Sequence, residues 1–240
     1  MSKLIAEIGL NHLGDPKRLM VMIEKIIASK VYALTIQIQN DEYYNLSKPF
    51  RKKIDLDLYK KFSKKLKSKK IKFGIALVDK KTLQDFSSVN VDFWKILSMQ
   101  FFNKELIKKA LATKKKVYLS TGVVSMQDIK AMAKRFKSLN FIHTSFSLSL
   151  NKANLLAIKK MKNEVKNQIS FGLHSNLDSL IISAIALESE SIFFYVKNKD
   201  KKHYPDDDHA IYLEELKVKV KNWKKMILSL GNGIKKRESL

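Results

Sequence analysis

Short apolar runs alternate with longer amphipathic segments along the whole chain, at a nearly constant spacing. The runs are typical of buried strands, and they cover residues 5–8, 33–38, 71–77, 93–97, 117–119, 141–144, 169–173 and 192–196. The segments between them carry apolar residues on one face and mostly lysine on the other, which predicts helices. These helices are expected over residues 15–29, 56–67, 81–86, 104–113, 125–136, 153–164, 176–187 and 213–228. One strand–helix rhythm without a linker predicts a single (β/α)₈ TIM barrel over residues 1–240.

The second predicted strand indicates how the barrel is filled. In residues 33–38, Ala, Thr and Gln alternate with Leu, Ile and Ile. In residues 71–77, Gly74 and Ala76 alternate with bulky residues in the same way. Small or polar side chains on one face and apolar ones on the other suit a strand between a barrel lumen and outer helices.

The charge is strongly positive, with a formal net charge of +24 at pH 7. Such a balance invites a nucleic-acid interpretation. Lysine supplies almost all of it, however, and the lysines are spread over most of the predicted helices, whereas specific readers of bases and phosphates favour arginine. We therefore expect weak, salt-sensitive adsorption to polyanions and no specific nucleic-acid partner.

The composition and the N-terminal sequence limit the possible chemistry and the expected cellular location of the protein. The chain has no cysteine, which excludes disulfides, thiolate metal sites and thiol nucleophiles. The N-terminal apolar run is too short for a signal peptide and contains Glu7. No stretch approaches the roughly 18 apolar residues of a membrane span. We expect a cytoplasmic protein with no membrane partner.

Candidate chemistry gathers where the strands end. Lys95 interrupts an apolar strand and is followed by Ser98, while the next strand runs into the turn Ser120-Thr121-Gly122. An isolated ammonium in apolar surroundings is costly unless it is paired or binds an anion. A cation, hydroxyl groups and turn amides at neighbouring strand ends suit a phosphate or carboxylate ligand. Glu7 is either a catalytic acid or a structural partner of such a lysine.

Two histidine-containing regions are better explained by structural roles than by ligand binding. His143 ends a strand, where a core histidine is more common than a ligand. His203, His209 and the aspartates at 206–208 cluster enough to suggest a metal site. Without a fixed spacing on a rigid element, a solvated acidic loop is the better interpretation of that cluster.

Three segments resemble the signatures of the N-acetylneuraminate (sialic acid) synthase family. They are AEIGLNHLGD at residues 6–15, Lys95-Ile96 followed by Ser98, and KKKVYLSTG at residues 114–122. The resemblance implies a TIM barrel that condenses phosphoenolpyruvate with an amino sugar to form a nine-carbon keto acid. Such synthases use Mn²⁺ or Mg²⁺ and carry a C-terminal antifreeze-like domain, which we expect to be absent here.

The resemblance assigns roles only to positions that match. Glu7 falls on the catalytic or sugar-binding glutamate of the family. Lys95 and the two serines fall on phosphoenolpyruvate contacts, and Asp208-His209 looks like the late Asp-His pair whose aspartate holds the sugar. The predicted substrate-binding residues are therefore Gln37, Lys95, Ser98, Ser120 and Asp208.

Several matching positions have changed. Thr35 stands where the family has a lysine, Ala76 where it has a threonine, and Gln100 where it has a second glutamate. The two metal histidines fall at Asn176 and Val196, so we predict no metal at the family position. A metal held by His174 and the acidic loop is the alternative, and the cofactor is left open.

These observations give two functional hypotheses. The first is a divergent sugar-acid synthase, a transferase that forms a carbon–carbon bond between phosphoenolpyruvate, or a similar phosphorylated acid, and an amino sugar. The second is a catalytically inactive synthase-like barrel that works as an accessory or regulatory partner. The possible protein partners are a second copy of the chain and an intact synthase.

Overall fold

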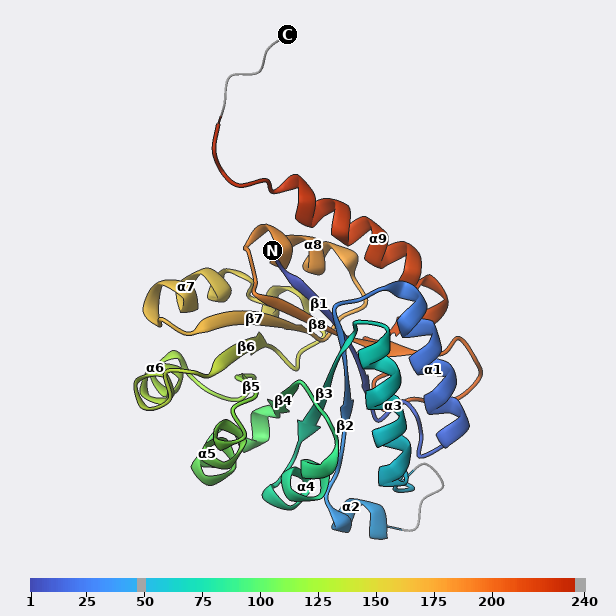
Figure 1. The fold of residues 1–240 in the computed structure, drawn as a ribbon. Helices are drawn as coiled ribbons and strands as arrows, with labels where there is room; N and C mark the ends of the chain where they lie inside the picture. Colours follow the sequence, from blue (N-terminus) through green and yellow to red (C-terminus); the bar gives the residue numbers. More distant parts are fainter. Residues whose placement is uncertain (47–50, 236–240) are drawn as a thin grey trace.

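Parallel strands close into a barrel in the computed structural model, which describes residues 1–46 and 51–235 (Figure 1). The eight barrel strands within these residues are β1 (Lys3–Gly9), β2 (Ala33–Gln37), β3 (Lys72–Leu77), β4 (Phe93–Ile96), β5 (Lys116–Ser120), β6 (Asn140–Thr144), β7 (Gln168–Leu173) and β8 (Ser191–Lys197). Each strand pairs with the next in the sequence, and β1 pairs with β8 to complete the ring. The (β/α)₈ fold predicted from the sequence is confirmed.

Helices surround the barrel on its outer face (Figure 1). They are α1 (Pro16–Ser29), α3 (Leu56–Ser68), α4 (Lys80–Asp85), α5 (Lys104–Ala112), α6 (Met126–Arg135), α7 (Leu156–Glu164), α8 (Asp178–Ala186) and α9 (Leu213–Ser229). Among the described residues, no helix has the length and apolarity needed to cross a membrane.

Local signals place several helix starts. The Asp15 side chain accepts hydrogen bonds from the amides of Lys17 and Arg18, and a proline follows it at the first helical position. A capping box begins α6, because the side chains of Ser125 and Asp128 each bond the backbone amide of the other. These caps satisfy amides that the first helical turn leaves without partners.

Three details differ from the sequence prediction. A short helix, α2 (Asp41–Asn45), lies between the strand predicted to end at residue 38 and the helix predicted to begin at residue 56, where no element was predicted. Residues 47–50 of this connection lie outside the described residues. Helix α7 starts at Leu156 instead of residue 153, because Asn154 has a positive φ of 42° that interrupts the helix. A short strand, β9 (Ile211–Tyr212), pairs with β8 beyond the barrel.

The apolar residues form two separate clusters, one inside the ring of strands and one outside it. The inner cluster is Ile5, Ala33, Phe93, Tyr118, Ile142 and Phe193. The outer cluster fills the layer between the strands and the helices, and it includes Leu34, Ile36 and Ile38. The alternation predicted for residues 33–38 is confirmed, with Ala33 in the lumen and its apolar neighbours facing the helices.

The amino-terminal end of the barrel is closed by an ion cluster around Glu190. This carboxylate accepts hydrogen bonds from Lys3 and Lys116, each at 2.6 Å, and from the Ser191 hydroxyl at 2.5 Å. Burial would raise the pKa of Glu190, but the hydrogen bonds from Lys116, Lys3 and Ser191 outweigh it and lower the pKa to about 2. The cluster therefore stays paired over the whole physiological pH range.

We expect Gly74→Ala to destabilise the barrel, because a Cβ at this position would lie 2.2 Å from the Phe93 ring inside the lumen. Overpacking of this kind costs about 1–3 kcal/mol, which for a chain of this size lowers the melting temperature by several degrees. Gly172→Ala is the matched control, since its Cβ would lie 3.0 Å from a methyl of Ile142 and cost less. Equal melting temperatures for the two variants in thermal unfolding would contradict this packing.

Candidate active site

A pocket of about 210 Å³ opens at the carboxyl end of the barrel strands. It is lined by Glu7, Gln37, Lys95, Leu97, Ser98, Met99, Ser120, Ile142, Thr144, Phe146, Gly172 and His174. The structure thus brings together the predicted Glu7, Gln37, Lys95, Ser98 and Ser120. This end of a TIM barrel is where such proteins build their active sites.

A buried ion pair forms the floor of the pocket. Lys95 Nζ lies 2.5 Å from Glu7 Oε1, and the two side chains are 6% and 4% exposed. The Thr35 hydroxyl donates to the same Glu7 oxygen at 3.1 Å. Lys95 Nζ also lies 5.3 Å from the ring centre of Phe193 and 5.6 Å from that of Tyr195, which adds cation–π attraction. The structural pairing considered for Glu7 is therefore present, and a ligand anion would have to share Lys95 with it.

The Ser120-Thr121-Gly122 turn is fixed by neighbouring strands. The Thr121 hydroxyl and amide both donate to the Ile142 carbonyl, at 2.9 and 3.0 Å. The Gly122 amide donates to Ser98 Oγ at 3.0 Å, so this amide is not free for a ligand as the sequence suggested. A Cβ on Gly122 would lie 2.9 Å from the Phe146 ring and 3.1 Å from Ser98 Oγ, which favours glycine there.

Strand β1 ends in a bulge that shapes the far side of the site. Its register with β2 shifts between Glu7 and Gly9, and Gly9 has a φ of 56°, in the left-handed region that favours glycine. A Cβ on Gly9 would lie 2.8 Å from Asp206 Oδ2 and 2.8 Å from the Tyr195 ring. The bulge therefore leaves room for a carboxylate that the sequence did not single out.

Asn11 holds this carboxylate's loop against the barrel. Its side-chain amide donates to the Val196 carbonyl at 2.9 Å, and its side-chain oxygen accepts from the Asp206 amide at 3.2 Å. Burial, followed by the nearby Glu7 carboxylate, raises the pKa of Asp206 to about 7. A group with this pKa exchanges a proton near neutral pH, as general acids and bases do.

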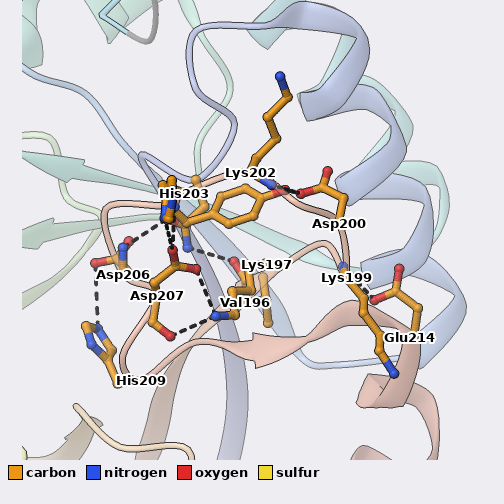
Figure 2. Close-up of polar contacts among 12 residues, drawn as sticks. Val196, Lys197, Lys199, Asp200, Lys202, His203, Asp206, Asp207, His209 and Glu214 are labelled. Carbon is orange, nitrogen blue, oxygen red and sulfur yellow. Dashed lines mark hydrogen bonds and ion pairs between the residues drawn. The ribbon is translucent and has the colours of Figure 1, made fainter.

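Two histidines pack beside Asp206. The rings of His174 and His209 stack 4.7 Å apart, and Tyr195 contacts each of them edge to face. Burial, followed by His209 and Lys95, lowers the pKa of His174 to about 3, and burial also lowers the pKa of His209. Both imidazoles are therefore neutral at pH 7. Figure 2 shows the contact from His209 to Asp206, in which Nε2 lies 3.6 Å from Oδ1.

The predicted Asp208 lies apart from this group. Its side chain is exposed and does not line the pocket. The Asp206 carbonyl accepts from the amides of His209 and Ala210, which makes a tight turn that carries Asp208 away from the barrel. Asp207 points toward Lys197 and accepts from it at 2.9 Å (Figure 2). Of the three consecutive aspartates, Asp206 is the one whose carboxyl group lies beside Gly9 and Tyr195, although it does not itself line the pocket.

The donor set does not fit the divalent metal that the resemblance implies. Within residues 1–46 and 51–235, no three His, Asp or Glu side chains are placed to hold a metal ion. Asn176 is exposed, and Val196 is buried in β8 with an apolar side chain. The lone pairs of an imidazole lie in the plane of its ring, so the stacked rings of His174 and His209 do not converge on one ion between their faces. No metal-dependent step is derived for this chain.

Removing one partner of the buried pair should cost far more than replacing both. We expect Lys95→Met to destabilise the protein by about 3–5 kcal/mol, because it leaves the Glu7 carboxylate buried without a cation. The double variant Glu7→Gln with Lys95→Met should recover most of this loss. Urea unfolding of the wild type and the three variants, including Glu7→Gln alone, measures the coupling. Additive losses would contradict the pairing.

Asp206 should make stability depend on pH in a defined direction. Its folded pKa of about 7 lies above the value of about 3.9 in an unfolded chain, so the folded state holds the proton more tightly. This contribution is fully present below pH 4 and is lost as the pH rises through 7. When the pH rises from 4 to 8, the wild type should therefore lose about 2–4 kcal/mol more of its unfolding free energy than Asp206→Asn does.

Urea midpoints between pH 4 and pH 8 check this dependence. Asp208→Asn is the matched control, because it changes the same charge on the same turn at an exposed position. A difference between Asp206→Asn and the wild type that stays constant with pH would contradict a protonated carboxyl at this site.

The chain is similar in sequence and in structure to known sugar-acid synthases. The chain is 25% identical to N,N'-diacetyllegionaminic acid synthase of Campylobacter jejuni over 97% of its own length and 78% of that protein. Its structure is similar to that of the N-acetylneuraminic acid (sialic acid) synthetase of Leptospira borgpetersenii, with a TM-score of 0.87, 25% identity, and coverage of 99% of this chain and 88% of that one.

A more distant neighbour shares the fold. The spore coat polysaccharide biosynthesis protein of Bacillus subtilis superposes with a TM-score of 0.81 and 21% identity, over 99% of this chain and 71% of that one. The model of the NeuB family matches residues 20–235, which is most of the sequence. The chain therefore belongs to the NeuB family, and its relatives place it in sugar-acid biosynthesis.

Proposed function

We propose that this protein is a divergent synthase that condenses phosphoenolpyruvate with an amino sugar to form a keto sugar acid. The observation that carries the proposal is the single pocket that gathers Glu7, Gln37, Lys95, Ser98 and Ser120 at the carboxyl end of the barrel. The names of the legionaminic acid and sialic acid synthases that the chain resembles support the same reaction class.

The pocket residues divide by chemistry. Lys95 and the hydroxyls of Ser98 and Ser120 suit the carboxylate or phosphate of phosphoenolpyruvate, since a cation and hydroxyl donors stabilise anionic oxygens. Gln37 offers both a donor and an acceptor, which suits the hydroxyl and amide groups of an amino sugar. Glu7 lies next to Lys95 and orients it through their hydrogen bond.

Anion binding at this pocket should be weak. Lys95 is the only lysine or arginine that lines it among the described residues, and it is already paired with Glu7. Thr35 and Ala76, which stand where the family has a lysine and a threonine, add no cation to the pocket. A ligand anion therefore gains part of an interaction that the protein already has, and we expect a millimolar dissociation constant for phosphoenolpyruvate.

A catalytically inactive accessory barrel is the second candidate. The observation in its favour is the donor set described above, which does not fit the divalent metal of the family. A Lewis acid contributes several kcal/mol of transition-state stabilisation, so a family member without a substitute for it would retain ligand binding and lose turnover.

Binding is tested by thermal unfolding with phosphoenolpyruvate at about ten times its dissociation constant. Stabilisation by RT ln 11, about 1.4 kcal/mol, should raise the melting temperature by about 3–6 °C. Sulfate at equal ionic strength controls for the positive surface. The double variant Glu7→Gln with Lys95→Met keeps the site free of an unpaired charge and should lose the shift. Equal shifts for both anions in both proteins would contradict a phosphoenolpyruvate pocket.

Turnover separates the two candidates. The protein is incubated with phosphoenolpyruvate and a panel of amino sugars, and mass spectrometry detects the keto acid while a colorimetric assay detects phosphate. We expect both products from the wild type and neither from the double variant prepared in the same way. A specific phosphoenolpyruvate shift with no product from any sugar would establish the accessory candidate instead.

A further inference from the structure

The Asp206 carboxyl group is half-buried, and no hydrogen-bond donor of the kind that stabilises an ionised carboxylate accompanies it among the described residues. Its side chain is 18% exposed. Within the described residues no group donates a hydrogen bond to it, and its nearest polar contact is His209 Nε2 at 3.6 Å. That nitrogen is itself buried without a hydrogen-bond partner. By contrast, Glu7 accepts from Lys95 and Thr35. The two neighbouring carboxyl groups therefore have opposite surroundings.

Charged and titratable groups from several elements surround the Asp206 carboxyl group. The charged and titratable groups that face it are Glu7 of β1, Lys95 of β4, Tyr195 of β8, Tyr43 of α2, and Asp207 and His209 of its own loop. Lys95 is the one cation in this set, and it is already paired with Glu7. Burial and the Glu7 charge raise the pKa of Asp206 to about 7, in agreement with the missing donors.

The position of Asp206 is fixed by the Asn11 side chain and by the bulge at Gly9. The Asn11 side chain binds its amide, and the Gly9 bulge provides the space that its carboxyl group occupies. Tyr195 and His209 pack against it, and His209 stacks on His174, which lines the pocket. The carboxyl group does not itself line the pocket, and His209 and His174 connect it to the pocket wall.

We propose that Asp206 is the general acid of this site and donates a proton to the aldehyde oxygen of the acceptor sugar as the carbon–carbon bond forms. This inference rests on the proposed synthase function. It supplies the electrophilic activation that the family obtains from a divalent metal, for which the described part of the chain lacks a fitting donor set. Proton transfer by a positioned acid contributes about 10²- to 10⁴-fold in rate.

The step balances with phosphoenolpyruvate and water as the only other reactants. C3 of phosphoenolpyruvate bonds to the aldehyde carbon, the carbonyl electron pair moves to the aldehyde oxygen, and that oxygen takes the Asp206 proton. Water adds to the cationic C2, and one of its protons returns to Asp206. The bond from C2 to the phosphate oxygen then breaks, the remaining hydroxyl proton passes to phosphate, and the keto acid is left.

Other groups at the site are poorer proton donors. Glu7 is an acceptor for both Lys95 and Thr35. His174 and His209 have lowered pKa values and are neutral at pH 7, so each would have to give up the proton of a neutral ring. Asp206 is the group near the pocket that holds an acidic proton at neutral pH.

The test measures kcat/KM for keto acid formation from pH 5.5 to 8.5, with a chelator present or with added Mn²⁺. The wild-type rate should fall as the pH rises through 7 and should not depend on the metal. Asp206→Asn should be about 10²- to 10⁴-fold slower at pH 6.5 and should lack this fall. Asp208→Asn, the exposed neighbour, should keep it. Urea unfolding confirms that each variant is folded.

The outcomes separate this inference from the function on which it rests. Product from the wild type, with Asp206→Asn within about threefold of it or with the fall above pH 7 retained, overturns the role of Asp206 and leaves the synthase function standing. The same holds if Asp208→Asn shows the loss instead, or if turnover requires Mn²⁺. No product from the wild type with any sugar overturns the synthase function itself, and the acid role with it.

Discussion

The ion pair between Glu7 and Lys95 is the interaction on which the rest of the site depends. It joins β1 to β4 across the barrel lumen. Two buried charges are tolerated only because they satisfy each other and because Thr35 and the rings of Phe193 and Tyr195 complete their surroundings. Burial is the main cause of the raised pKa of Asp206 and of the lowered pKa of His174, and the pair adds to both shifts, Glu7 to the first and Lys95 to the second.

Glutamate and lysine side chains pair at both ends of the barrel, but the two ends differ in how many donors each carboxylate receives. At the amino-terminal end, Glu190 receives two lysines and a serine hydroxyl, so its acceptor capacity is taken up within the protein. At the carboxyl end, one glutamate meets one lysine beside an open pocket, and a second carboxyl group nearby is left without donors. This difference follows the division of labour in TIM barrels, in which the amino-terminal face serves stability and the carboxyl-terminal face serves chemistry.

The sequence predicts the strands, and with them the pocket floor, because a lysine inside an apolar strand is conspicuous and strand ends in a parallel barrel meet at one mouth. It could not identify Asp206. Three identical aspartates follow one another, and which of them faces inward depends on a backbone turn and on Asn11, 195 positions earlier. The motif pointed to Asp208, which the turn carries outward. The short helix α2 was hidden in a polar loop, although Asn40 caps its start.

The pairing of β1 with β8 has a consequence for how the chain is made. Strand β1 finds its second barrel neighbour only when residues 191–197 have been synthesised, so one edge of β1 has no barrel partner while the intervening strands are made. Contacts between positions so far apart slow folding, and an exposed strand edge is a template for intermolecular association. Until β8 emerges, that edge of β1 is open to such association, and a chain interrupted before β8 cannot close the barrel at whose carboxyl end the pocket lies.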